Sequence, residues 1–409
     1  MPDADLVIAG SGLVGLTLAC ALRHSGLRLL LVDPGHGPAG KSDPRSVALA
    51  PGSRHIFEAL GVWPRLAGRM APIRSIHVSE RGGFGRVRLE AEEQGMAALG
   101  HVIMNRDLEA ALWQRINDDP GSLSLLTGTQ VQAPENDRDR IRMELLEQQT
   151  RRTVSARLLL AADGAGSPLR QAAGLGAEEL DYCQVALVAT VRASRPHQGQ
   201  AFERFTPGGP LALLPLPDGR LSLVWSAPSA RADTLAPLDD AAFLAELQQA
   251  FGYRLGRLLE VNDRGAWPLR LRRARRRRDG RLLLVGNAVC NLHPVAGQGL
   301  NLALRDVAGL AEALHEAAQA GQDPALSREL AAWLRAQHRV QQRVTAFTHG
   351  LVGLFSNEFP GLRLARNAGL LLLAGLPPLR RGFAGLGMGR HGGGGRLSRG
   401  LPLDGDGRD

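Results

Sequence analysis

The start of the chain holds a glycine-rich turn between two short apolar segments, and this feature constrains the fold most. Residues 5–9 (DLVIA) predict a buried strand, residues 16–24 predict a helix, and residues 27–32 predict a second strand that ends in Asp33. Such a turn lets a pyrophosphate approach the backbone, and the acid is positioned for a ribose. The segment therefore predicts a dinucleotide-binding βαβ unit, a device that NAD and FAD share. Its three glycines are Gly10, Gly12 and Gly15.

A second glycine-rich turn lies much later in the chain. Residues 282–285 form an unbroken apolar run, which is typical of a parallel strand covered on both faces. Apolar residues recur at helical spacing from Leu300 onward, so the GQG before it lies at a helix N-terminus, which suits an anion or a flat ring. Seen alone, GQG would be an ordinary strand-to-helix turn, but the motifs upstream favour a ligand. The residues concerned are Pro294, Gly297, Gln298, Gly299, Leu300 and Asn301.

Two further segments place charged residues at the ends of predicted elements. Asp163 follows a predicted buried strand over residues 157–162, at the edge where parallel sheets bind ligands. Arg106 lies in the first turn of a helix that we expect Asn105 to cap. The helix dipole disfavours a cation there, so Arg106 should have an anionic partner such as a phosphate. Arg45 lies in a loop and either contacts the cofactor or is one more surface arginine.

The middle of the chain changes to strands without helical crossovers. Residues 183–272 predict an antiparallel sheet with one helix over residues 239–251, and residues 75–90 predict a β-hairpin. We expect this second domain to cover the opening of the first, with the substrate pocket between them. Residues 270–281 carry eight arginines without interleaved aromatic residues, so nucleic acid is not expected. We interpret this segment as a solvated strand edge and turn, with attraction to anionic lipid or to a nicotinamide cofactor as the alternative.

Composition argues against a nucleic-acid-binding, metal-binding, disulfide-bonded or membrane-spanning protein. The net charge of +9 comes almost wholly from arginine, since Lys41 is the only lysine, so it indicates a codon bias more than a polyanionic partner. The three cysteines have no metal-binding spacing, so neither a disulfide nor a metal site is expected. The N-terminus lacks the pattern of a signal peptide and no apolar run would span a bilayer, so we expect a cytoplasmic protein. Residues 349–384 predict short helices with flanking arginines, which either pack on the protein or lie peripherally at the inner face of a membrane.

Three motifs in one order carry a family resemblance: GSGLVG at 10–15, DGAGSPLR at 163–170 and GNAVCNLHPVAGQGLN at 286–301. Together they resemble the signature set of the FAD-dependent aromatic hydroxylases of the para-hydroxybenzoate hydroxylase type. RSVALAPGS, NRDLEAAL and FERFTPGGPLALLPL further resemble the ubiquinone-biosynthesis branch, above all its 2-polyprenyl-6-methoxyphenol hydroxylases. The motif departs from most of the family at Asn287 and Cys290, where aspartate and histidine are usual. The Asn287 carbonyl still offers an acceptor for a ribityl hydroxyl, and the asparagine resembles what the ubiquinone-biosynthesis branch uses.

The resemblance implies a role in FAD binding for each motif. The glycines at 10–15 would face the pyrophosphate, Asp33 the adenosine ribose, and Asp163 would belong to a motif used for both FAD and NAD(P)H. Pro294 would lie against the reactive edge of the flavin, and the N–H groups of residues 297–301 near its pyrimidine end. The remaining implied contacts are Arg45 and Arg106 with the ribityl–pyrophosphate side, Val131 with the adenine through its backbone, Gly164 beside Asp163, and Asn287 with a ribityl hydroxyl.

The resemblance also implies the fold: an α/β protein with a Rossmann-like FAD-binding domain, an interwoven antiparallel-sheet substrate domain and a C-terminal helical segment. The FAD-binding domain is expected to come in two parts, because the substrate domain interrupts it. The expected divisions are FAD-binding residues 1–181 and 273–348, substrate-binding residues 182–272, the helical segment 349–384, and a disordered Gly/Arg-rich tail over 385–409.

The family reaction supplies the expected function. NAD(P)H reduces the flavin, O₂ forms a flavin C4a-hydroperoxide, and one oxygen atom is transferred to an electron-rich ring, here a polyprenylated phenol of ubiquinone biosynthesis. No second βαβ unit is visible for NAD(P)H, as expected of such a hydroxylase. His293 is either the base that ionises the phenol or a hydrogen-bond partner behind the site. The alternatives are a related hydroxylase for another ring position or phenol, a flavin reductase that does not use O₂, and a non-catalytic flavoprotein that holds other ubiquinone-biosynthesis enzymes at the membrane.

Overall fold

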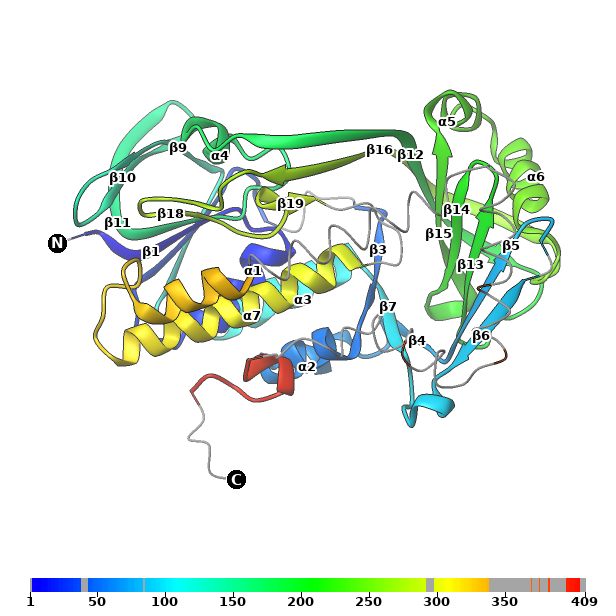
Figure 1. Cartoon of the computed structure of the whole chain (residues 1–409), viewed down its shortest axis with the longest axis horizontal. Helices are drawn as coiled ribbons and strands as arrows, with labels where there is room; N and C mark the ends of the chain where they lie inside the picture. Colours follow the sequence, from blue (N-terminus) through cyan, green and yellow to red (C-terminus); the bar gives the residue numbers. More distant parts are fainter. Residues whose placement is uncertain are drawn as a thin grey trace.

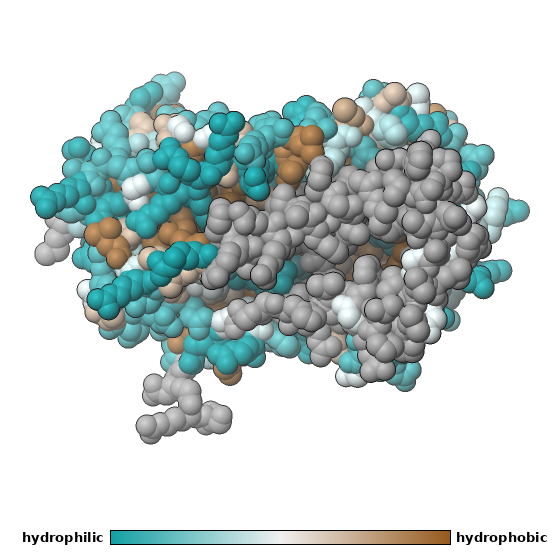
Figure 2. Space-filling view, viewed as in Figure 1, coloured by the Kyte–Doolittle hydropathy of each residue, from teal (hydrophilic) through white to brown (hydrophobic). Residues whose placement is uncertain are grey.

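The computed structural model describes residues 2–37, 43–83, 85–291, 298–337 and 395–404, together with Gly369, Gly375 and Gly382. Within these ranges no helix has both the length and the apolar content needed to cross a membrane. The described part of the surface in Figure 2 is mostly hydrophilic, with hydrophobic residues in small areas. The expected membrane-facing segment lies outside the described residues, apart from the three glycines.

A mainly parallel sheet forms one half of the molecule (Figure 1). Its parallel strands have the order β18 (Leu282–Leu284), β11 (Thr150–Ala161), β1 (Ala4–Ala9), β2 (Leu29–Asp33) and β8 (Leu123–Thr127). Antiparallel pairs are added by β17 (Arg278–Asp279), β10 (Ile141–Glu147) and β9 (Thr129–Asn136). The strands are apolar on both sides because both faces are covered. One face packs on α1 (Leu13–Leu22), α3 (Asn105–Asp118) and α7 (Gln298–Gln319), and the other on residues of β9, β10 and α4 (Pro168–Ala172).

A second eight-stranded sheet forms the other half. Its order is β19 (Cys290–Asn291), β16 (Leu258–Ala274), β12 (Ala177–Ala193), β15 (Arg220–Pro228), β14 (Gly209–Pro215), β13 (Gln200–Thr206), β5 (Ser75–Glu80) and β6 (Arg86–Glu90). The predicted hairpin of residues 75–90 is present, and it extends this sheet through a parallel pairing of β5 with β13. Two helices lie on the outer side of the sheet: the expected α6 (Asp240–Phe251) and α5 (Ser229–Leu235), which the sequence did not predict.

The two halves are joined by long strands and by a small sheet. β12 and β16 pair along most of their length and run from one half to the other, so the expected divisions at residues 181 and 272 fall inside continuous strands (Figure 1). The small sheet has the order β3 (Ser46–Leu49), β7 (Gly100–Met104) and β4 (Met70–Ile73), and α2 (Pro51–Ala59) follows β3. Single-turn 3-10 helices occur at Trp63–Leu66, Glu92–Gln94, Pro217–Gly219, Gly286–Ala288 (η5) and Leu397–Arg399 (η7).

The interpretation of residues 270–281 as a solvated edge is wrong for its last arginines. Arg281 is 4% exposed, and it donates to both carboxylate oxygens of Asp323 at 2.8 and 3.1 Å. Arg277 donates to Asp306 Oδ1 at 3.0 Å and lies 4.2 Å from the centre of the Trp333 ring. Both acids are distant in sequence, so the local charge pattern did not reveal that these arginines hold α7 and the following helix to the sheet.

The expectation of a disordered tail is wrong for residues 395–404. Leu397 is 1% exposed and Leu403 is 7% exposed, and both belong to the core cluster that includes α2 and α7. The backbone N–H of Arg396 also donates to Glu312 on α7 at 3.2 Å. Two buried leucines and a backbone hydrogen bond to α7 therefore dock this polar stretch.

Candidate functional site

Three loops that are far apart in the sequence meet at one edge of the first sheet. They follow β1, β11 and β18, which are adjacent parallel strands, so their carboxyl ends lie side by side. Ala162 donates its N–H to Ala9 at 2.8 Å, and Val285 donates to Ala161 at 2.9 Å. The glycine-rich turn and the loop after β18 also touch, since a Cβ on Gly286 would lie 2.9 Å from Val14 Cγ1. The first glycine-rich turn and the beginning of the 286–301 motif are therefore neighbours, as expected if both motifs bind one cofactor.

The glycines of the first loop have different tasks. Gly10 has φ +109°, and a Cβ there would lie 2.5 Å from the Ala162 carbonyl oxygen; a Cβ on Gly15 would overlap the carbonyl oxygen of Gly10. These two residues allow the strand, the helix and β11 to pack closely. Gly12 is the N-cap of α1, and a Cβ there would meet nothing within 4 Å. Its open side leaves the free N–H groups of the helix accessible, as a pyrophosphate requires.

Asp33 holds this loop in place from the end of β2. Its side chain is buried, Oδ2 accepts the Ser11 N–H at 2.6 Å, and Oδ1 accepts the Gly35 N–H at 2.7 Å. Charge-assisted bonds to backbone N–H groups are strong, so the carboxylate fixes the turn between β1 and α1. The sequence pattern did not indicate this positioning role, and the ribose contact of Asp33 stays a prediction.

The second loop contains a carboxylate oxygen without a partner. Asp163 Oδ2 accepts the Leu169 N–H at 3.1 Å, whereas Oδ1 is buried and accepts no hydrogen bond from a described residue. Burial raises the pKa of Asp163 above its ordinary value. A buried acceptor left unpaired costs about 1–3 kcal/mol, so a ligand hydroxyl at this point would be stabilising. Gly164, beside it, has φ +90° and open space where a Cβ would stand.

Arg170 joins the second loop to the third, a role that the sequence reasoning missed although the residue ends the DGAGSPLR motif. Its buried guanidinium donates to the Ala288 carbonyl and to the Ala165 carbonyl, both at 2.9 Å. Burial, with Arg272 nearby, lowers the pKa of Arg170. The two bonds place η5 beside Asp163, and Asn287 in η5 is exposed at that edge.

The start of α7 is partly described. Gln298 is its first residue, a Cβ on Gly299 would meet nothing within 4 Å, and Leu300 is half-buried. Asn301 is buried and its side chain is engaged: Oδ1 accepts from Ala50 N–H at 2.8 Å and from Ser53 Oγ at 2.7 Å. Asn301 therefore fixes α7 to the corner between β3 and α2, which leaves only its backbone for a ligand. Pro294, His293 and Gly297 lie outside the described residues, so their roles stay predictions.

The two predicted arginines lie on neighbouring segments. Arg45 pairs with Asp43 at 2.8 Å and lies 5.5 Å from the centre of the Trp267 ring, and its carbonyl accepts the Asn105 N–H at 2.9 Å. The expectation that Asn105 caps α3 is wrong, because the helix already begins with this residue. Its side chain instead donates to Asp43 at 3.2 Å. Arg106 makes no hydrogen bond or ion pair with any described residue, so the anion expected for it is not a protein carboxylate in this part of the chain.

Val131 lies in β9, is 6% exposed, and belongs to the same hydrophobic cluster as Val32 at the end of β2. Its strand is therefore next to the one that ends in Asp33. Its proposed contact with an adenine would use the backbone and stays a prediction.

The chain matches the FAD binding domain family over residues 3–348. It belongs to this family. The chain is 39% identical over 407 residues to the ubiquinone hydroxylase UbiL of Rhodospirillum rubrum, covering 98% of this chain and 94% of that protein. It is 32% identical over 377 residues to the 3-demethoxyubiquinol 3-hydroxylase of Escherichia coli, covering 90% and 94%. The predicted resemblance to FAD-dependent hydroxylases of ubiquinone biosynthesis is confirmed, and the protein is an FAD-dependent monooxygenase.

Solved structures share the fold of this family member. The p-nitrophenol 4-monooxygenase PnpA of Pseudomonas putida superposes with a TM-score of 0.78 at 19% identity, covering 93% of this chain and 96% of that one. PqsL of Pseudomonas aeruginosa superposes with a TM-score of 0.75 at 23% identity, covering 90% and 99%. The predicted α/β fold, with a Rossmann-like half and a β-sheet half, is confirmed.

The site of this FAD-binding protein fits its cofactor. Among the described residues, Gly12 has an open side where a pyrophosphate would fit, Asp163 Oδ1 has no hydrogen-bond partner, and the Arg106 guanidinium has no partner. Within the described residues, Arg170 joins the second loop to the third and Asp33 fixes the first loop to the end of β2.

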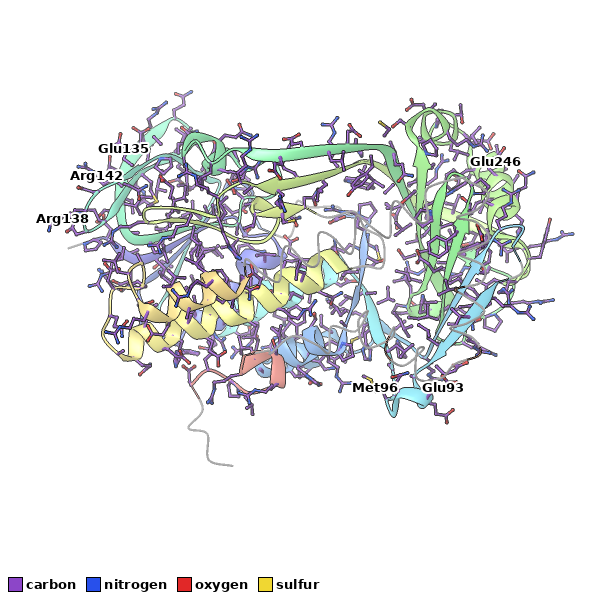
Figure 3. The ribbon with its side chains drawn as sticks, in the orientation of Figure 1. Glu93, Met96, Glu135, Arg138, Arg142 and Glu246 are labelled. Carbon is purple, nitrogen blue, oxygen red and sulfur yellow. The ribbon has the colours of Figure 1, made fainter. Side chains whose placement is uncertain are left out.

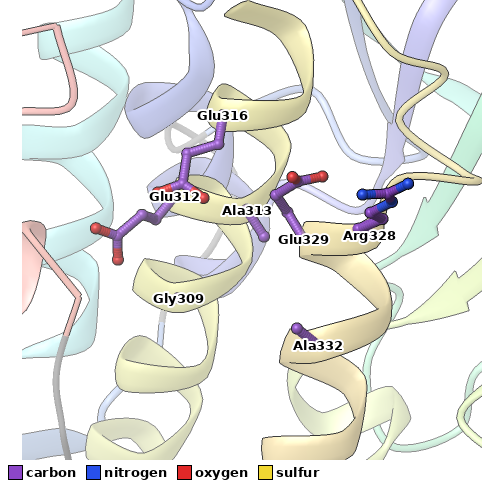
Figure 4. A pocket seen from close by; sticks show the side chains of 7 residues that line it. All are labelled: Gly309, Glu312, Ala313, Glu316, Arg328, Glu329 and Ala332. Atoms are coloured by element: carbon purple, nitrogen blue, oxygen red, sulfur yellow. The ribbon is translucent and has the colours of Figure 1, made fainter. Parts of the chain in front are cut away.

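A hollow of about 370 Å³ lies elsewhere, between α7 and the helical residues 328–337 (Figure 4). Gly309 on its wall is eleven residues past the start of α7, about 16 Å along the helix from the flavin loops. Three of its seven lining residues are glutamates, and burial together with the neighbouring carboxylates of Glu312 and Glu329 raises the pKa of Glu316. It is not part of the FAD site.

Proposed function

We propose that this monooxygenase hydroxylates a polyprenylated phenol of ubiquinone biosynthesis, with NAD(P)H as the electron donor. One oxygen atom of O₂ enters the ring as a hydroxyl, and the other leaves as water with two electrons from NAD(P)H and two protons, one of them from the ring carbon. The printed names of the relatives support the substrate class, since they are a ubiquinone hydroxylase and a demethoxyubiquinol hydroxylase.

The observation that carries this proposal is the convergence of three loops at one sheet edge, facing a second sheet joined by β12 and β16. In the proposed site the N-terminus of α1 binds the pyrophosphate of FAD, Asp33 the adenosine ribose, and Asp163 with Asn287 the ribityl hydroxyls. Bound FAD supplies the redox chemistry, taking a hydride from NAD(P)H and activating O₂. The chain's N–H groups at the start of α7 stabilise negative charge at the pyrimidine end of the ring.

The remaining predicted residues complete the proposal. Arg45 and Arg106 lie on the ribityl–pyrophosphate side, and Val131 contacts the adenine through its backbone. Pro294 and His293, outside the described residues, are proposed to shape the reactive edge and to act on the phenol or behind it. Residues 349–383 are proposed to bind the membrane surface at its cytoplasmic face, where the prenylated substrate and other enzymes of the pathway would be met.

The test uses purified protein loaded with FAD. Addition of a short-chain prenylated methoxyphenol should stimulate NAD(P)H oxidation, and isotopically labelled O₂ should leave one labelled atom in the product by mass spectrometry. A product without label, or undiminished turnover without O₂, would contradict a monooxygenase reaction on this substrate. Flotation with liposomes of anionic phospholipid tests the membrane part separately, because the hydroxylation assay does not depend on it.

A further inference from the structure

Glu203 lies in the middle of β13 and faces the FAD-binding half of the molecule. Its neighbours Phe202 and Arg204 point to the outer face of the sheet, where the Phe202 ring is 5.4 Å from that of Phe251 and Arg204 Nε donates to Ala250 at 3.2 Å, both on α6. Glu246 of α6 marks this outer side in Figure 3. Because side chains alternate along a strand, Glu203 must point the opposite way.

The strand register places Glu203 between two residues of the same sheet, Ser222 and Trp267. Each of them contacts the segment at Arg45 and Ser46, where β3 begins. Glu203 is opposite Ala212, and Ala212 is opposite Val224, so these residues form one row on the inner face. Ser222 lies two positions before Val224 on β15, and therefore on the same face. It accepts a hydrogen bond from Ser46 of β3 at 2.7 Å. On the other side, the next row contains Trp267, over which the Arg45 guanidinium lies at 5.5 Å. The carboxyl group therefore faces the same space as the proposed flavin site.

The described neighbours of Glu203 on its face of the sheet have small or apolar side chains. The residues beside it across the sheet are Ala212 and Val78, and Gly265 ends its row on β16. Glu203 keeps partial access to solvent among the described residues, so its carboxyl group is not sealed inside the core. The other carboxylate on this face, Glu80 opposite Phe205, is buried and has interactions of its own.

Glu203 itself makes no hydrogen bond or ion pair with a described residue, and burial alone raises its pKa to about 7. Burial of the ionised carboxylate costs free energy at neutral pH, and an uncharged side chain would avoid the cost of the charge. Carboxyl groups with pKa values raised toward neutrality in a cleft are typical of proton-transfer sites. This observation and the geometry point to the same role.

We propose that Glu203 binds the hydroxyl group of the phenol substrate and acts as its general base. The phenolic O–H bond breaks, the proton passes to a carboxylate oxygen of Glu203, and the oxygen's electron pair enriches the ring carbons that receive the new oxygen. Glu203 later returns the proton to solvent. The inference rests on the proposed function. It assigns the role of phenol base, for which His293 was the only candidate in the sequence analysis.

The pKa values decide what kind of base Glu203 is. A phenol has a pKa of about 10, so transfer to an ordinary glutamate at about 4.3 would be unfavourable by roughly a millionfold. With the raised pKa of Glu203, about 7, the mismatch falls to roughly a thousandfold. Glu203 therefore accepts the proton as the ring is attacked and does not hold a free phenolate beforehand.

The test compares Glu203→Gln with Glu203→Asp and with Glu246→Gln, a control on the outer face of the same sheet. Each FAD-loaded variant is assayed with the short-chain prenylated methoxyphenol for hydroxylated product. We expect Glu203→Gln to lower kcat by about a hundredfold or more, Glu203→Asp to recover part of it, and the control to match the wild type. The wild-type rate should rise with pH through about 7, and the glutamine variant should lose this rise, which a merely structural residue would not affect.

The outcomes are distinguishable from failure of the proposed function. A wild-type enzyme that gives no hydroxylated product overturns that function and this inference with it. An active wild type with a glutamine variant within about threefold of its kcat and the same pH profile overturns only the role of Glu203. Should the glutamine variant fail to bind FAD, the wild-type profile decides: a rate that is flat through neutral pH overturns the inference, and a rising rate supports it.

Discussion

Replacing Gly10 and Gly12 with alanine, one at a time, should separate folding from cofactor binding in the same loop. At Gly10 the new methyl group would lie 2.5 Å from the Ala162 carbonyl oxygen, about 1 Å inside ordinary contact, and the backbone is held at φ +109°. Strained backbone costs of order 1–3 kcal/mol and overpacking a similar amount. We therefore expect Gly10→Ala to lower the free energy of unfolding by about 2–6 kcal/mol, even without FAD.

Gly12→Ala should leave the stability of the FAD-free protein unchanged and weaken FAD binding. Its φ of −70° suits alanine, and no atom lies within 4 Å of the new methyl group. The loss of an N-cap glycine and the gain from a less flexible unfolded chain are each under about 1 kcal/mol, so stability without FAD should hardly change. The methyl group would, however, occupy the space proposed for the pyrophosphate, and FAD affinity should fall by about tenfold or more, or 1.4 kcal/mol.

The assay needs two measurements on each protein. Urea unfolding of the FAD-free protein, followed by fluorescence, gives the stability change, and titration with FAD, followed by flavin fluorescence, gives the affinity. If Gly10→Ala unfolds at the wild-type urea concentration, the steric reasoning is wrong. If Gly12→Ala binds FAD as tightly as the wild type, the pyrophosphate does not lie at the start of α1.

Three further substitutions test other contacts. Asp306→Asn should cost about 3–5 kcal/mol by leaving Arg277 buried without its partner, whereas Glu144→Gln in the exposed pair with Arg151 should cost under about 1 kcal/mol; thermal unfolding compares them. Leu397→Ala should cost about 2–5 kcal/mol, and an unchanged melting temperature would mean that the tail is not docked. Asp163→Asn should raise the melting temperature of the FAD-free protein, because burial raises the pKa of Asp163, yet weaken FAD binding in a titration; tighter binding would contradict a hydroxyl partner for Oδ1.

Local patterns were enough to predict the FAD-binding half. The turn at Gly10 and the strand before Asp163 are short-range signals, and parallel strands place their carboxyl ends at one edge whatever their order. The start of α7 was likewise predicted within one residue, because its apolar spacing is helical throughout.

Long-range pairings could not be predicted in this way. The hairpin of β5 and β6 pairs with β13, which is more than a hundred residues away in the sequence. The alternating pattern of the hairpin does not indicate which strand it pairs with. The same holds for Arg281 and Asp323, whose pairing converts an apparent surface charge into a buried contact. Arg170 and Glu203 were missed for a related reason. The role of Arg170 depends on two carbonyls that the fold brings to it, and that of Glu203 on its burial without a partner among the described residues.

The burial of Glu203 without a partner among the described residues has a consequence for stability that needs no substrate. The chain has 49 lysine and arginine residues against 40 acids, and many surface acids have ion pairs, yet burial alone sets the pKa of Glu203 at about 7. A carboxyl group whose pKa is raised on folding stabilises the protein fully below its unfolded value of 4.5, and this contribution is lost as the pH rises through about 7. The FAD-free wild type should therefore lose roughly 2–3 kcal/mol across this window through this residue, and Glu203→Gln should remove that part of the loss. Urea unfolding at several pH values measures it, and identical pH dependence in the two proteins would mean that Glu203 is not held unpaired inside the fold.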